Sequence, residues 1–156
     1  MTSPNFRRAC VSAALLTIVV GTAARAQKAP APPPSPLASA KVLACSFPAF
    51  GSARWDAATP QVVNGSQDFS FKIDLIDYKK KNARIVAEGT AFATLLMTPM
   101  AMNVIEQTNS GNVILTSIFM GGNQGKTYLA VHARHLGEPD GPPRTSQAYG
   151  SCVLEP

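Results

Sequence analysis

The octapeptide FSFKIDLI, residues 69–76, decides the fold. Its apolar residues Phe69, Phe71, Ile73 and Leu75 alternate with mostly polar neighbours. A period of two places successive side chains on opposite faces of an extended chain. The octapeptide therefore predicts a β-strand that buries the face carrying these four side chains.

Further segments with strand character flank this one, separated by Gly, Pro, Asn and Lys turn signals. They are residues 41–50, 83–88, 90–97, 100–108, 113–120, 127–135 and 147–154. Most connections are too short for crossovers, so neighbouring strands should pair antiparallel. We expect an all-β meander of about eight strands that closes into a small barrel, since closure removes exposed edges. A two-layer β-sandwich is the alternative. Phe69, Phe71 and Phe92 are bulky enough to fill a narrow barrel interior.

The amino-terminal residues 1–26 have the pattern of a signal peptide. Arg7 and Arg8 precede an apolar run from Ala9 to Ala24, and Ala24 and Ala26 are small residues at the positions that a signal peptidase reads. The run has roughly 16 residues, whereas a membrane-spanning helix needs about 20. We therefore expect a periplasmic or secreted protein with no stable membrane insertion after signal removal.

Charge and composition bound the rest of the chain. The chain has 156 residues and a net charge of +5, and removal of residues 1–26 leaves 11 basic and 9 acidic side chains. The only basic run, Lys79 to Lys81, is expected in a turn, so nucleic acid is not an expected partner. Residues 27–38 are rich in Pro and predict a disordered spacer. Residues 39–156 then form a single β-barrel-like domain.

Two cysteines remain after signal removal. Cys45 lies in the first predicted strand and Cys152 in the last, and an exported chain with two cysteines is expected to bridge them. Such a bridge would join the strands that a closed barrel places side by side. Two distant cysteines and two His residues do not form a metal-binding pattern, so we expect no metal.

Five short stretches of the chain carry a resemblance. They are FKID (71–74), ARI (83–85), IEQT with a following GN (105–112), AVHARH (130–135) and SQAYGSC (146–152). They resemble a family of small secreted bacterial proteins that has no established activity, over residues 41–154. Such a resemblance implies export and no particular chemistry. A small exported β-barrel with cysteines near both ends is also similar, in architecture alone, to periplasmic lysozyme inhibitors of the C-type.

The strand at residues 127–135 is the richest in reactive groups. Tyr128, His132 and Arg134 share one face, and the more apolar opposite face is expected to be the core side, leaving the trio outward. In a small barrel the reverse assignment would place the trio in the lumen. Glu106 is expected on a neighbouring strand, where it could form a cross-strand ion pair with Arg134.

Two long connections are the other candidates for a contact surface. Residues 51–67 contain Trp55, which either caps the barrel end or serves as an exposed anchor beside an arginine. Residues 136–146 contain three prolines and predict an ordered loop.

The sequence favours a non-enzymatic binding or interaction protein of the cell envelope, whose partner is another envelope protein or a small ligand. No nucleophile elbow, phosphate loop or cofactor motif is present, so no catalytic residue and no cofactor are assigned. The tentative binding residues are Trp55, Glu106, Tyr128, His132 and Arg134. A small periplasmic enzyme using His132 with Glu106 or Tyr128 is one alternative. A structural envelope component is another.

The signal peptide gives the first testable prediction. The exported protein should begin near Gln27, because the small residues Ala24 and Ala26 precede it. Intact-mass measurement of the protein recovered outside the cytoplasm checks this, and a mass that retains residues 1–26 would refute it.

Overall fold

The computed structural model describes residues 36–57, 59–121 and 126–156. The predicted signal peptide and residues 27–35 of the predicted spacer lie outside these ranges. A short 3-10 helix, η1 (Pro36–Ser39), precedes the first strand and buries Leu37 completely. Ordered structure therefore includes the last three residues of the predicted spacer.

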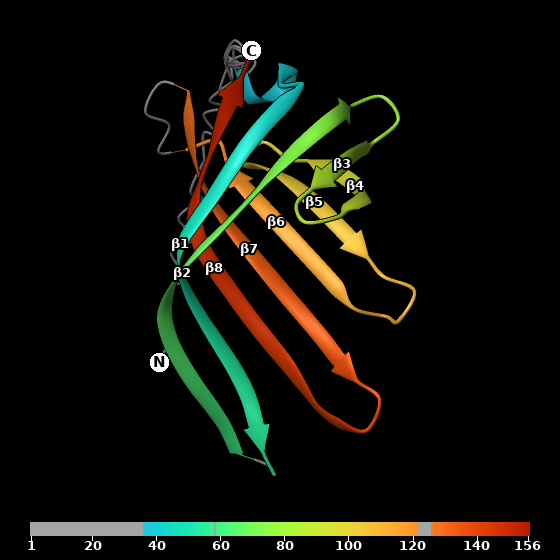
Figure 1. Ribbon diagram of the computed structural model, residues 1–156. Helices are drawn as coiled ribbons and strands as arrows, with labels where there is room; N and C mark the ends of the chain where they lie inside the picture. Colours follow the sequence, from blue (N-terminus) through green and yellow to red (C-terminus); the bar gives the residue numbers. More distant parts are fainter. Residues whose placement is uncertain (1–35, 58, 122–125) are drawn as a thin grey trace, which may run out of the picture. The chain divides into compact units, whose positions relative to one another are not determined.

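Eight strands follow in chain order (Figure 1). They are β1 (Val42–Asp56), β2 (Thr59–Asp77), β3 (Asn82–Val86), β4 (Thr90–Met97), β5 (Ala101–Gln107), β6 (Val113–Phe119), β7 (Thr127–Glu138) and β8 (Gly141–Glu155). Each strand pairs antiparallel with the next, and β1 also pairs antiparallel with β8. The sheet is thus one closed ring, which confirms the predicted meander and excludes the two-layer sandwich. The predicted Lys79–Lys81 turn also lies between two strands.

The interior of the ring is apolar at the end where β1 begins and β8 ends. Alternate residues of β1, namely Leu43, Cys45 and Phe47, point inward and are buried, and inward residues from the other strands meet them. Leu37 of η1 joins this core. The Tyr78 hydroxyl donates to the Leu37 carbonyl oxygen at 2.6 Å and lies 3.2 Å from the Ala40 carbonyl oxygen. These contacts hold residues 37–40 against this end of the ring.

The predicted burial is correct for part of residues 69–76 and wrong for Leu75. Phe71 and Ile73 are buried, but Leu75 is 58% exposed and Ile76 takes the interior position. The β2–β3 register shifts between Asp74 and Asp77, and Leu75 has a positive φ of 48°. This irregularity reverses the alternation, because an extra residue in a strand moves every following side chain to the other face.

Phe92 does not fill the interior as predicted. It is 76% exposed on β4, where the neighbouring Ala93 and Leu95 face inward instead. Small Ala93 suits a narrow interior that Phe47 and Phe71 already occupy, with their ring centroids 5.4 Å apart.

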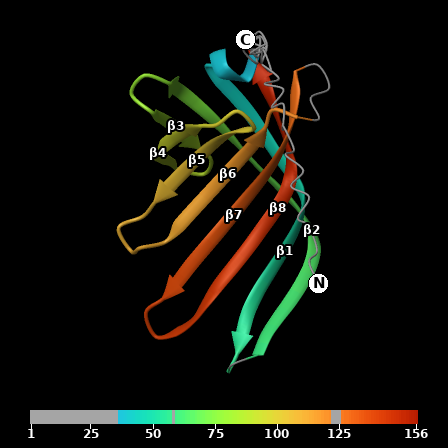
Figure 2. The same ribbon diagram turned by 180° about the vertical axis from the view of Figure 1, so that it is seen from behind.

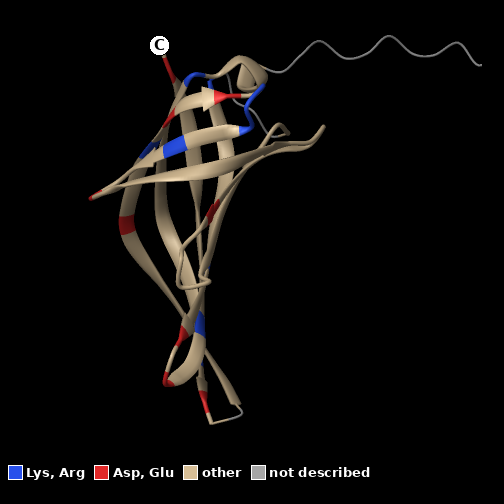
Figure 3. Cartoon of the chain, turned by 90° about the vertical axis from the view of Figure 1, so that its right-hand side faces the viewer, with Lys and Arg blue, Asp and Glu red and all other residues tan. Residues whose placement is uncertain are grey.

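Four strands continue beyond the ring as a sheet that we call the extension (Figures 1 and 2). It comprises residues 49–56 of β1, 59–66 of β2, 136–138 of β7 and 141–149 of β8. Figure 3 shows it as a narrow tail that carries both basic and acidic residues. The described parts of the predicted connections 51–67 and 136–146 are therefore mainly strands, with turn residues between β7 and β8. Most of their residues are exposed, so no alternation of buried and exposed residues marked them in the sequence.

The disulfide between Cys45 and Cys152 joins the first strand to the last across a separation of 107 residues. It lies inside the ring, where both cysteines are buried. Close by, β8 approaches the β1 bulge so tightly that a Cβ on Gly150 would lie 1.9 Å from the Ser46 carbonyl oxygen. Only glycine fits there, so the closure of the ring depends on Gly150 as well as on the disulfide.

We expect removal of the disulfide to destabilise the ring without changing its topology. A cross-link over about 100 residues contributes up to roughly 4.7 kcal/mol by restricting the unfolded chain, and losses of 2–5 kcal/mol are usual. Urea unfolding of Cys45→Ala/Cys152→Ala beside the wild-type protein measures the loss. An unchanged free energy of unfolding would contradict the argument.

Candidate functional site

The inner face of β7 carries Tyr128 and His132 into the ring interior. Tyr128 is fully buried and His132 is 6% exposed, whereas Leu129 on the other face is 56% exposed. The predicted outward orientation of the trio is therefore wrong, and the lumen orientation holds. Tyr128 lies directly opposite Cys152 in the β7–β8 pairing, so the face with the disulfide is the face with the trio.

His132 is enclosed by aromatic rings. The ring centroids of Phe69, Phe71 and Phe47 lie 5.1, 5.2 and 5.7 Å from that of the imidazole. The buried Thr116 hydroxyl lies 3.0 Å from His132 Nδ1 and shares a hydrogen bond with it. Burial, and secondarily the charge on Arg134, lower the pKa of His132 to about 4. The imidazole is therefore neutral at neutral pH.

A cleft opens where the ring gives way to the extension; we call it the mouth cleft. It consists of three cavities of about 560, 120 and 620 Å³ that share lining residues. Phe47, Phe69 and His132 form its floor, and Arg134, which is exposed, lines all three cavities. The predicted residues His132 and Arg134 thus belong to one site.

Glu106 lines the same cleft but not in the predicted pairing. β6 lies between β5 and β7, so Ile114 separates Glu106 from Arg134 in the register. The predicted neighbouring position is wrong, and among the described residues no carboxylate lies within ion-pair distance of Arg134. Glu106 instead shares an acidic side of the cleft with Asp68 and Glu88.

The extension adds two more arginines to the opposite side of the cleft. Arg54 of β1 and Arg144 of β8 are directly opposite each other in the register and line the same cavity as Arg134. Glu138 accepts hydrogen bonds from Arg144, through Nε at 2.9 Å and through a guanidinium NH₂ group. Within the described ranges, Arg54 has no such partner. Sequence reasoning treats the segments of Arg54 and Arg144 as two separate connections, so it does not bring either arginine together with Arg134.

The remaining predicted residues lie apart from the cleft. Tyr128 belongs to the buried core, and its hydroxyl has no hydrogen-bond partner among the described residues. Trp55 is a half-buried residue of β1 near the tip of the extension, opposite Pro60. By strand alternation it faces away from Arg54. Trp55 therefore neither caps the barrel nor lines the cleft.

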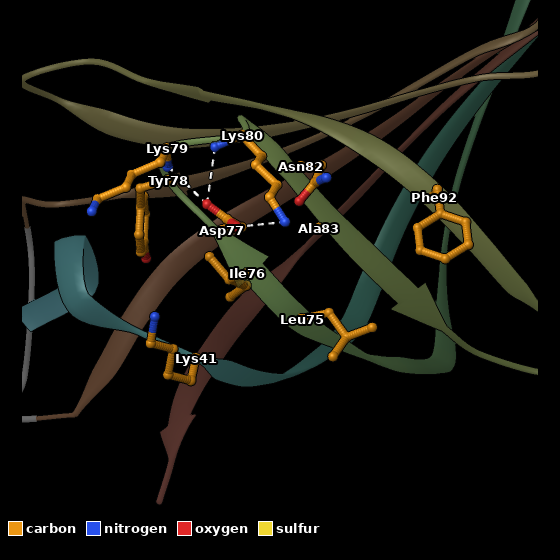
Figure 4. Close-up of a pocket in the computed structure, with 10 residues that line it drawn as sticks. All are labelled: Lys41, Leu75, Ile76, Asp77, Tyr78, Lys79, Lys80, Asn82, Ala83 and Phe92. Atoms are coloured by element: carbon orange, nitrogen blue, oxygen red, sulfur yellow. Dashed lines mark hydrogen bonds and ion pairs between the residues drawn. The ribbon is translucent and has the colours of Figure 1, made fainter.

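A second cavity lies near the β2–β3 turn (Figure 4). Exposed Leu75 and Phe92 contribute its apolar surface. Asp77 accepts hydrogen bonds from the backbone N–H groups of Lys79 and Lys80, both at 2.9 Å, and these bonds lower its pKa. The carboxylate thus stabilises the turn itself, so this cavity offers fewer groups for a ligand than the mouth cleft does.

Comparisons with known proteins add no identity to these observations. No protein-family model matches the chain, and no curated protein matches it significantly. The described residues contain no cluster of three His, Cys, Asp or Glu side chains that could hold a metal ion. No helix in the same residues is long and apolar enough to cross a membrane.

The burial of His132 predicts a stability loss in acid. The pKa is about 4 in the folded protein and about 6.5 when unfolded, so the unfolded chain binds the proton more readily. The resulting stability is fully present above pH 6.5 and declines as the pH falls towards 4, by about 3 kcal/mol in total. Urea unfolding at pH 7 and pH 4 should show this extra loss in wild type and not in His132→Gln.

His135→Gln is the matched control, because His135 lies on the same strand but is exposed. It should keep the wild-type pH dependence. An equal acid loss in wild type and His132→Gln would contradict the assignment.

Proposed function

We propose that this protein is an exported, non-enzymatic binding protein that holds a small amphipathic anion in the mouth cleft. The apolar part of the ligand contacts the aromatic floor, and its anionic group lies against Arg134 with Arg54 beside it. The observation that carries this proposal is the position of Arg134, which lines all three parts of the cleft and has no carboxylate partner among the described residues.

The charge arrangement supports an anion rather than a cation at this point. Arg54 faces Arg144 directly, and like charges in that position destabilise a sheet. Glu138 neutralises one of the two arginines. A bound anion would offset the positive charge that Arg54 and Arg134 bring to this cavity without a carboxylate partner among the described residues. Charge-assisted hydrogen bonds from guanidinium groups are among the stronger polar contacts in proteins.

The apolar floor supports a ligand with a ring or chain. Phe47 and Phe69 pack with ring centroids 6.0 Å apart, and Phe50 continues the same surface towards the extension. Ligand sites typically combine such apolar walls with a few convergent polar groups. The mouth cleft has both.

The properties of His132 favour a binding function over a catalytic one. A general base works best with a pKa near the ambient pH, whereas the pKa of His132 is about 4. Its Nδ1 is already engaged with Thr116, and Glu106 is two strands away. The imidazole is better suited to form part of an aromatic floor than to move protons. A purely structural envelope role would leave the unpartnered Arg134 unexplained.

Export is proposed from the amino-terminal sequence, and the disulfide supports it. Disulfides persist in oxidising compartments such as the periplasm or the extracellular medium.

Two fluorescent probes that share a ring system test the ligand chemistry. Anilinonaphthalene sulfonate carries an anionic group, and phenylnaphthylamine is its neutral counterpart. The sulfonate should bind more tightly to the wild-type protein. Arg134→Gln should weaken sulfonate binding by roughly tenfold or more, since a hydrogen bond to a charged group contributes about 1.5–3 kcal/mol. Fluorescence titration measures both affinities.

Lys126→Gln is the control for net charge, because Lys126 is an exposed turn residue immediately before β7, at the opposite end of that strand from Arg134. It should leave sulfonate binding unchanged, and Arg134→Gln should leave phenylnaphthylamine binding unchanged. Equal loss of sulfonate binding in both variants would show that the probe senses overall charge and would reject the site.

A further inference from the structure

In the extension, β2 has a strand partner on one side only. β1 pairs with it from Thr59 onward, whereas β3 first pairs with it at Lys72. Among the described residues, no strand pairs with the other side of β2 between Thr59 and Phe71. That edge therefore presents a row of unpaired backbone N–H and C=O groups.

The free edge of β2 lacks the usual protection against strand addition. Edge strands are commonly protected by charged side chains, prolines, bulges or short length. Residues 59–67 contain no charged residue, and their single proline, Pro60, lies at the outer end. Every residue from 59 to 68 is exposed, including Val62 at 69% and Val63 at 55%. The pairing with β1 is regular up to Ser66.

The opposite edge of the extension is protected. β7 continues past its pairing with β6 only from Leu136 to Glu138. On this short edge, the Asn112 side chain accepts a hydrogen bond from the Gly137 backbone N–H at 2.9 Å, and Glu138 adds a charge. The contrast singles out β2 as the edge that remains able to pair.

We propose that this edge pairs with the same edge of a second copy of the chain, antiparallel about a twofold axis. The two extensions then form one continuous sheet, four strands from each copy. A strand paired with itself in this way satisfies both free edges through a single self-complementary contact.

A second copy fits this edge better than a charged strand of another protein. An axis near Val63 places Val62 opposite Asn64 and Gln61 opposite Gly65, so no charged residue faces another. The axis is perpendicular to the sheet, so the inner faces of both extensions lie on the same side. The dimer would therefore present two arginine-bearing surfaces in one plane. This inference does not depend on ligand binding in the mouth cleft.

Sedimentation equilibrium of the mature protein over a wide concentration range tests the proposal. The wild-type protein should approach the dimer mass, and Val62→Lys/Asn64→Lys should weaken association at least tenfold, because each copy then brings like charges across the axis. The control Leu129→Lys/Val153→Lys adds the same charge to exposed positions of the ring and should dimerise like wild type. A monomeric wild-type protein, or dimers of equal strength in all three proteins, would overturn the proposal.

A cysteine at the axis gives a second readout that does not rely on weakening the dimer. Val63→Cys should form an intermolecular disulfide on mild oxidation, and Leu129→Cys should not. Equal cross-linking of both variants would also overturn the proposal. Binding of anilinonaphthalene sulfonate should be the same in Val62→Lys/Asn64→Lys as in wild type, so failure of the dimer is distinguishable from failure of the proposed function. If the wild-type protein is monomeric but captures an extended peptide along β2, the partner is another chain and self-association is rejected.

Discussion

The pairing of the first strand with the last is the contact on which the rest of the structure depends. It turns a meander into a ring, and the Cys45–Cys152 disulfide and the close approach at Gly150 lie within it. It also fixes which side chains face inward. Because Cys152 faces the interior and lies opposite Tyr128, the face of β7 that carries His132 and Arg134 must face the interior too.

Polarity changes along that face from one end of the ring to the other. Tyr128 is fully buried among apolar side chains, His132 is buried but hydrogen-bonded to Thr116, and Arg134 is exposed in the cleft. A closed ring of short strands can be filled by side chains, and here the filling stops where the extension begins. The cleft is thus the open end of a core whose other end is covered by Leu37 of η1. This arrangement places an arginine beside aromatic rings.

The sequence predicts the ring itself well, because strands with one buried face alternate in polarity. Prediction from alternation fails for strands that have no buried face. The described residues of 51–67 and 136–146 are mainly strand residues that are exposed, so the small and polar residues of these segments resemble those of loops. Leu75 lies at the β2–β3 register shift, and the alternation of residue types does not reveal such a shift. The inward orientation of His132 was obscured by apolar Leu129 and Val131 on the outer face, although the positions of Cys45 and Cys152 held a usable signal. The mouth cleft could not be predicted from alternation, since it combines inward residues of the ring with residues of the extension.

The extension is held in place differently from the ring. Beyond Phe47 and Phe69 the strands have little buried apolar surface, and β2 is exposed on both faces from Thr59 to Asp68. Segments with few buried contacts open at a lower free energy than the global unfolding of the protein. Amide hydrogens near the tip should therefore exchange with solvent through local fraying, while those beside the disulfide exchange only when the ring opens. We therefore expect a slowly exchanging ring joined to a rapidly exchanging extension, so that two walls of the cleft differ in their exchange rates.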